Sequence, residues 1–182
     1  TIITGKFEYA AEDGKNRIVI IGQNREKGKV KSLISEFAGD STEIFDGLAS
    51  AIKKKHNDEV VVGIFKYDRD NGEKRVISFG WESLVHEFRE DGTEVENDLG
   101  SAISKKIRKT IPSSCFDCTV TSILEYKTLS GEKRFMAFLS YGFHGGRIVY
   151  SVFEFKEDGS EVKDGLADKI MSKYIVFIVE NV

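Results

Sequence analysis

The stretch FKYDRDNGEKRVISF, residues 65–79, decides how this chain is organised, because related stretches stand before it and after it. They are FEYAAEDGKNRIVII, beginning at Phe7, and LEYKTLSGEKRFMAF, beginning at Leu124. A tyrosine, a glycine and an arginine column are identical in all three copies. Each copy is an aromatic-rich run, a glycine-containing turn and an apolar run, which is a pattern typical of a β-hairpin.

A second stretch follows each hairpin. It reads EFREDGTEVENDLGSAI from Glu87 and has relatives that begin at Glu36 and Glu154. Six of its seventeen columns are identical in the three copies. Two related blocks that recur three times in the same order predict an internal repeat. The predicted units are 1–57, 58–116 and 117–174, followed by a C-terminal strand over 175–182.

Each unit is expected to hold three strands and one helix. The third strands are predicted over 29–37, 82–88 and 147–155. Apolar residues spaced four apart then predict a helix with one apolar stripe. The expected helix N-caps are Thr42, Thr93 and Ser160. The fold class is therefore α+β: three tandem β-β-β-α repeats with antiparallel sheets, helices on one face, and one continuous domain over 1–182.

Composition excludes several classes of function. The chain has 182 residues and a net charge of −3, with 27 basic and 30 acidic side chains. Residues 1–57 carry +2, residues 58–116 carry −3 and residues 117–182 carry −2, so there is no basic stripe of the kind that binds phosphate backbones. A membrane-spanning helix needs about twenty apolar residues, and no run approaches that length. We expect no membrane contact and a cytoplasmic location.

No catalytic constellation is visible. The sequence contains no metalloprotease motif, phosphate-binding loop or nucleophile–base pattern. Cys115 and Cys118 have the spacing of a redox pair, but they lead into a predicted strand rather than a helix N-terminus. A small redox or metal protein that uses these two thiols is the second alternative function. Otherwise we expect no catalytic residue, no metal and no cofactor.

Candidate binding residues lie in the connections where the units differ most. These are the turns at 23–28 and 141–147 and the short connection at Trp81, since loops that vary on a shared scaffold often carry binding. The candidates are Arg25, Lys27, Trp81, Tyr141, Phe143, His144 and Arg147.

The repeated tyrosine and arginine columns support the first alternative, a single-stranded nucleic-acid binder. Aromatic and basic side chains on a sheet face grip single strands by stacking and phosphate contact. The residues are Tyr9, Tyr67, Tyr126, Arg17, Arg75 and Arg134. In topology the sheet-then-helix units resemble the PUR-repeat and Whirly families, which bind single strands on their sheets; those units have four strands, whereas three are expected here. The structural alternative is that each tyrosine packs across its hairpin and each arginine pairs with a cross-strand acid.

The leading expectation is a non-catalytic protein-interaction module: an adaptor, an inhibitor, or a phage-type host-takeover or anti-defence factor. Abundant Lys, Glu and Ile with a single proline suggest an AT-rich genome, viral or bacterial. The expected partner is another protein. A homodimer is a further expectation, because strands that are apolar on both faces need a cover on each side.

Overall fold

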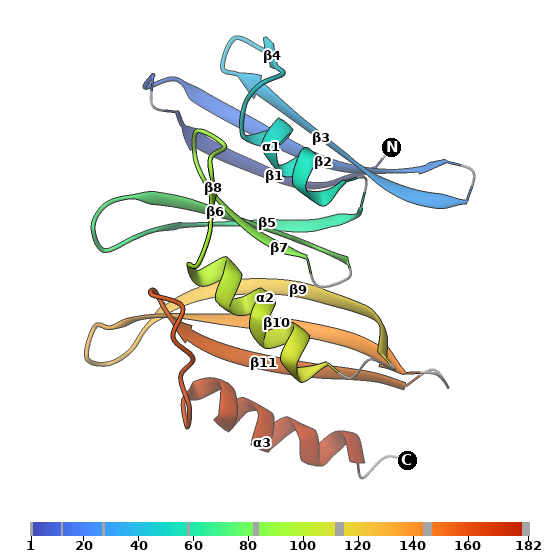
Figure 1. Ribbon diagram of the computed structural model, residues 1–182, viewed down its shortest axis with the longest axis vertical. Helices are drawn as coiled ribbons and strands as arrows, with labels where there is room; N and C mark the ends of the chain where they lie inside the picture. Colours follow the sequence, from blue (N-terminus) through green and yellow to red (C-terminus); the bar gives the residue numbers. More distant parts are fainter. Residues whose placement is uncertain are drawn as a thin grey trace.

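The structure is a computed structural model, and its description covers residues 2–11, 13–26, 28–57, 59–81, 84–111, 115–143 and 147–179. It is an α+β structure with three antiparallel sheets and three helices (Figure 1). Within these ranges no helix has the length and apolar character that a membrane crossing requires.

The first four-stranded sheet has the order β1-β2-β3-β4 and is followed by a helix. Its elements are β1 (Ile2–Ala10), β2 (Asn16–Glu26), β3 (Lys29–Ala38), β4 (Glu43–Ile44) and α1 (Leu48–His56). The second sheet repeats this order, with β5 (Val61–Asp68), β6 (Lys74–Gly80), β7 (Val85–Arg89), β8 (Glu94–Val95) and α2 (Leu99–Thr110).

The third sheet has three strands in the order β11-β10-β9. Its elements are β9 (Cys115–Lys127), β10 (Lys133–Phe143), β11 (Arg147–Lys156) and α3 (Leu166–Val179). Where the other sheets have β4 or β8, an isolated bridge joins Phe155 to Glu161. The two-residue strands β4 and β8 were not predicted from the sequence.

The predicted helix starts at Thr42, Thr93 and Ser160 are wrong, because each helix begins six residues later. The amide of Thr42 instead donates a hydrogen bond of 3.0 Å to the Asp40 carboxylate two residues earlier. Such a bond closes a turn rather than starting a helix. The same bond forms at Thr93 with Asp91 (2.7 Å) and at Ser160 with Asp158 (2.9 Å).

The predicted C-terminal strand over 175–182 is also wrong over residues 175–179. Helix α3 continues through Val179, so residues 175–179 are helical, and residues 180–182 lie outside the described residues. The apolar run follows the helix without a glycine or proline to end it. Periodicity alone does not distinguish a short apolar strand from the end of a buried helix.

The units are stacked so that each inner helix is covered from two sides (Figure 1). Helix α1 packs on β3 and also contacts β7 of the next sheet, and α2 packs on β7 and contacts β11. At the opposite edges of the sheets, β1 lies beside β5 and β5 lies beside β9. Two apolar cores therefore lie between sheets, one joining units 1 and 2 and the other joining units 2 and 3. A third, smaller core lies between the last sheet and α3.

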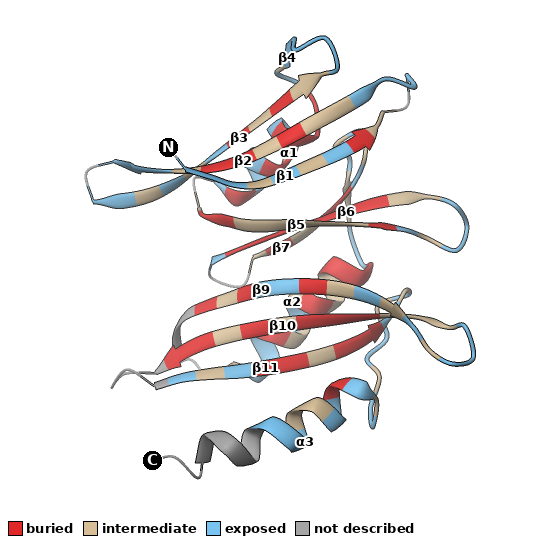
Figure 2. Ribbon diagram, turned by 180° about the vertical axis from the view of Figure 1, so that it is seen from behind, coloured by how far each residue is buried: buried red, intermediate tan, exposed pale blue. Residues whose placement is uncertain are grey.

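Strand β6 shows the consequence of this stacking (Figure 2). Every residue from Arg75 to Gly80 is buried. Val76 lies in the core shared with unit 1, whereas Ile77 and Phe79 lie in the core shared with unit 3. The strand is apolar at nearly every position after Arg75 because it has a neighbour on each face.

Candidate functional site

In units 1 and 3 the tyrosine and the arginine of the repeated columns both contact the buried carboxylate of the repeated glutamate. In unit 1 the Tyr9 hydroxyl donates a short hydrogen bond to Glu36, whose Oε1 also lies 3.2 Å from Arg17 Nη1. The second oxygen, Oε2, accepts a hydrogen bond of 2.9 Å from the amide of Ala49 in the first turn of α1. Glu36 is fully buried. Its charge therefore satisfies a helix N-terminus that has no side-chain cap of its own.

Unit 3 repeats this geometry. Tyr126 Oη donates to Glu154 Oε1 at 2.5 Å, Arg134 Nη1 lies 3.2 Å from the same oxygen, and the Ala167 amide donates to Oε2 at 3.0 Å. Tyr126 and Arg134 are direct partners across the β9–β10 ladder, so both side chains lie on one face of the sheet. Burial, followed by the hydrogen bond to Glu154, raises the pKa of Tyr126 to about 12.

The glycines that precede α1 and α3 leave room for the buried glutamate of the same unit. A Cβ atom at Gly47 would lie under 3.0 Å from the Glu36 carboxylate, and one at Gly165 would lie equally close to Glu154. The two glycines occupy one column of the sequence, and Gly47 is the N-cap of its helix.

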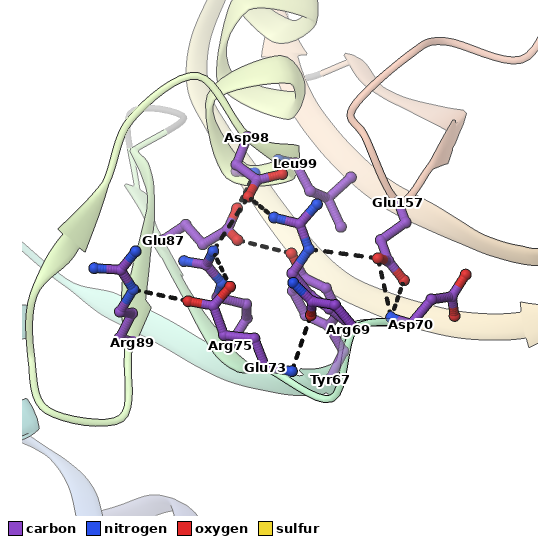
Figure 3. A network of polar contacts seen from close by, with 12 residues as sticks. Tyr67, Arg69, Asp70, Glu73, Arg75, Glu87, Arg89, Asp98, Leu99 and Glu157 are labelled. Carbon is purple, nitrogen blue, oxygen red and sulfur yellow. Dashed lines mark hydrogen bonds and ion pairs between the residues drawn. The ribbon is translucent and has the colours of Figure 1, made fainter.

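Unit 2 departs from the pattern because Asp98 occupies this glycine column. Tyr67 and the Gly100 amide still donate to Glu87, each at 2.7 Å (Figure 3). Arg75, however, donates to Glu73 at 2.8 Å and lies 3.7 Å from Asp98. Burial is the main reason that the pKa of Glu87 is raised above its ordinary value.

Arg69 connects Asp98 of unit 2 to unit 3. Arg69 Nη1 lies 2.6 Å from Asp98 Oδ2, and Arg69 Nε lies 3.4 Å from Glu157 Oε1 in the turn after β11 (Figure 3). The amide of Asp70 donates to both oxygens of Glu157 at 3.1 Å. This network holds the hairpin turn of unit 2 against the turn that leads to α3.

These contacts account for all six residues of the nucleic-acid alternative. Tyr9 and Tyr67 are buried, and the three tyrosine hydroxyls donate to carboxylates inside the protein. Arg17, Arg75 and Arg134 each form an ion pair with a carboxylate of their own unit. Base stacking needs an exposed ring face, so the placement of these side chains gives the nucleic-acid function no support, and it stays a prediction.

Two of the candidate binding residues, Arg25 and Trp81, line one cleft. The strands of unit 1 explain how Arg25 reaches it. Strand β1 pairs with β2 only as far as Gln23, whereas β2 and β3 remain paired to Glu26 and Lys29. Residues 23–26 therefore belong to the end of a two-stranded arm, where the sequence predicts a long turn over 23–28. The arm projects beyond its sheet on the side where β6 and β7 are connected (Figure 1).

The arm and the start of unit 2 line the cleft together. Its residues are Arg25, Gly28, Lys29, Val30, Glu59, Val60 and Trp81. Trp81 is 45 % exposed, and its backbone amide donates to the Val60 carbonyl at 2.9 Å, which fixes its position. Arg25 and Lys29 are exposed on the facing arm. The cleft thus combines an indole ring with two cations and the carboxylate of Glu59.

The structure does not bring the other candidate binding residues to this cleft. Tyr141 is buried in β10, and its hydroxyl lies 3.4 Å from Ser151 Oγ. Phe143 and Arg147 face each other as the last backbone pair of β10 and β11. Lys27 and His144 lie outside the described residues. The sequence in turn missed Lys29, Val30, Glu59 and Val60, because nothing local marks residues that form a cleft only when two units pack.

Cys118 and His56 are not among the described residues that line this cleft. Cys115 and Cys118 both lie in β9, and Cys118 is buried. Among the described residues, no three His, Cys, Asp or Glu side chains are arranged to hold a metal ion. His56 is fully buried at the end of α1, where its Nε2 lies 2.8 Å from Ser78 Oγ. The redox alternative stays a prediction.

Comparison of the chain with protein-family models, with curated proteins and with solved structures found no match.

Proposed function

We propose that this chain is a non-catalytic protein-interaction module and that the cleft at Trp81 is its contact surface for a partner protein. One observation carries the proposal: Trp81 of unit 2 and Arg25 and Lys29 of unit 1 face one cleft although they come from different units. Tryptophan and arginine are enriched among the residues that contribute most to protein–protein binding energy.

The chemistry of the cleft indicates what kind of protein surface would fit. The indole ring offers apolar area beside Val30, and the two cations attract carboxylates. A partner segment that places an apolar side chain next to an aspartate or glutamate would satisfy both features. The cations lie on an exposed arm, where they attract opposite charges on a partner and where reversal of a charge would repel them.

A tandem scaffold supports this role. We infer that the three units are copies of one β-β-β-α repeat, in which the shared carboxylate site maintains each unit. The copies differ in the connections that form the cleft, so one scaffold carries a specific binding surface.

The test is capture of a partner from a lysate of the source organism, followed by mass spectrometry. Wild type is compared with Trp81→Ala, which removes the ring, and with Arg25→Glu, which reverses the charge. Leu129→Ala is the matched control, because Leu129 is fully exposed in the β9–β10 turn and does not line the cleft. We expect both cleft variants to lose about tenfold or more of the captured protein, whereas the control retains it.

The proposal fails if wild type retains no protein, or if both cleft variants retain the same protein as fully as the control does. The identity of the captured protein then assigns the role. An enzyme that loses activity on binding indicates an inhibitor, and a component of host defence indicates an anti-defence factor. Two proteins retained together indicate an adaptor.

A further inference from the structure

On the outer face of α3, described side chains are exposed to solvent. The equivalent side chains of α1 and α2 are buried under the next sheet. Leu48 of α1 and Leu99 of α2 are fully buried, each between its own sheet and the next. Leu166 occupies the same column in α3 and is 41 % exposed. The column eight residues after this leucine shows the same contrast: His56 and Ile107 are buried, and Tyr174 is 59 % exposed.

The sheet of unit 1 shows the complementary contrast. Phe88 lies in the same core as Leu48, and Phe155 lies in the same core as Leu99, so each inner helix is covered by the phenylalanine of the next unit. Phe37 occupies this column in unit 1 and is only partly buried.

Its cross-strand neighbour Ile18 behaves in the same way. The residues in the Ile18 column of units 2 and 3, Val76 and Phe135, are fully buried, whereas Ile18 itself is partly exposed. Leu33 lies on the same face of β3 as Phe37 and is 42 % exposed. Ile18, Leu33 and Phe37 are called the head face here, and Leu166 and Tyr174 the tail face.

The two junctions inside the chain are built alike. A Cβ atom at Gly92 would meet the methyl group of Ala51 at 3.3 Å, and one at Gly159 would meet Ala102 at 2.9 Å. The two glycines occupy one column and the two alanines another. One mode of contact is therefore used twice, between units 1 and 2 and between units 2 and 3.

We propose that a second copy of this chain docks its head face on the tail face of the first, so that the same mode of contact is used a third time. A second copy fits because the chain itself carries both halves of this junction, one at each end of the stack. The net charges favour the pairing, since residues 1–57 carry +2 and residues 117–182 carry −2. The interface is heterologous, so copies join head to tail into rings or open rows.

Two positions make this contact weaker than the junctions inside the chain. Lys169 stands in the alanine column of α3, and Ser41 stands in the glycine column of unit 1. The longer side chain of Lys169 must move aside when the turn of the second copy approaches. Replacing it with alanine restores the side chain found at both internal junctions, so Lys169→Ala tightens the association.

The experiment measures mass against concentration by sedimentation velocity for the full chain. One chain has a mass of 20.4 kDa. Wild type is expected to exceed this mass as concentration rises, and Lys169→Ala is expected to do so at a concentration about tenfold lower, equivalent to about 1.4 kcal/mol. Leu129→Glu, which lies on neither face, is expected to behave as wild type does.

Blocked variants then distinguish head-to-tail from symmetric association. Leu166→Glu blocks the tail, and Ile18→Glu blocks the head. Leu33→Glu is a second head variant at a more exposed position, in case Ile18→Glu fails to fold. Each blocked variant alone is expected to remain a single chain. An equal mixture of a head-blocked and a tail-blocked variant retains one intact junction and is expected to form pairs that grow no further.

Three results would overturn the proposal. The first is that wild type and Lys169→Ala both keep the mass of one chain at every concentration. The second is that a blocked variant associates by itself as wild type does, which indicates a symmetric or different interface. The third is that the mixture of blocked variants forms no pairs although wild type associates.

Discussion

Protonation of His56 is expected to destabilise this protein in mildly acidic solution. The ring is fully buried between α1 and the second sheet, with Ser78 at 2.8 Å and the ring of His86 at 5.2 Å between centroids. Burial, with a smaller contribution from the charge of His86, lowers the pKa of His56 from 6.5 to about 4. The folded protein therefore excludes a proton that the unfolded chain binds between these two pH values.

The sign and the magnitude follow from this difference. Well above pH 6.5 the ring is neutral in both states, so it adds no pH dependence to the free energy of unfolding. As the pH falls from about 6.5 to 4, the unfolded state gains the proton first and stability is lost. The interval from 6.5 to about 4 corresponds to about 3 kcal/mol, a large part of the stability of a typical domain.

The assay is urea unfolding at a series of pH values from 7.5 to 4, for wild type and for His56→Gln. Glutamine retains a polar group that can reach Ser78 but does not titrate. Glu87, whose pKa is raised, contributes in the opposite direction and equally in both proteins. We expect wild type to lose about 3 kcal/mol more than His56→Gln over this range. Equal losses in the two proteins, or a His56 ring that titrates near pH 6.5 by NMR in the folded state, would refute the reasoning.

Two further predictions concern the buried carboxylates. Tyr67→Phe removes the hydroxyl that donates to Glu87 at 2.7 Å and is expected to lower the free energy of unfolding by about 1–3 kcal/mol. Tyr150→Phe, at an exposed position, is the control and should change the free energy of unfolding by less than about 0.5 kcal/mol. Equal effects in the two variants would contradict the role of the hydrogen bond. Gly47→Ala forces the carboxylate beside it to move and is expected to cost about 1–3 kcal/mol; Gly39→Ala, where the nearest atom is 3.7 Å away, is the control. Thermal and urea unfolding measure all four, and a Gly47→Ala protein as stable as the control would show that the close approach is unimportant.

The strands were more predictable than the helices. Hairpin turns contain glycine and lie between apolar runs, so their positions can be read locally. Helix starts could not be read in this way, because an aspartate two residues before Thr42 produces a turn that resembles an N-cap in sequence. The sequence predicts a strand over 175–182, but a short apolar segment fits either structure, and 175–179 are helical.

The candidate site was predictable only in part. Arg25 and Trp81 were found because the units differ at these positions. Glu59 and Val60 were missed, because they belong to the cleft only through the packing of unit 2 against the arm of unit 1. The repeated glutamates are visible in the sequence. Their common role is to accept a hydrogen bond from an amide in the first turn of the next helix, which depends on how close each strand lies to that helix.

The sequence by itself determined the hairpins and the α+β class, because these depend on local turn-formers and on the spacing of apolar residues. Only the tertiary structure decided which surfaces are covered. Phe37, Phe88 and Phe155 are one column of identical residues, yet two are buried and one is partly exposed. The physical reason is that burial depends on what lies opposite a side chain, and a helix of the preceding unit lies opposite only the second and third of these rings.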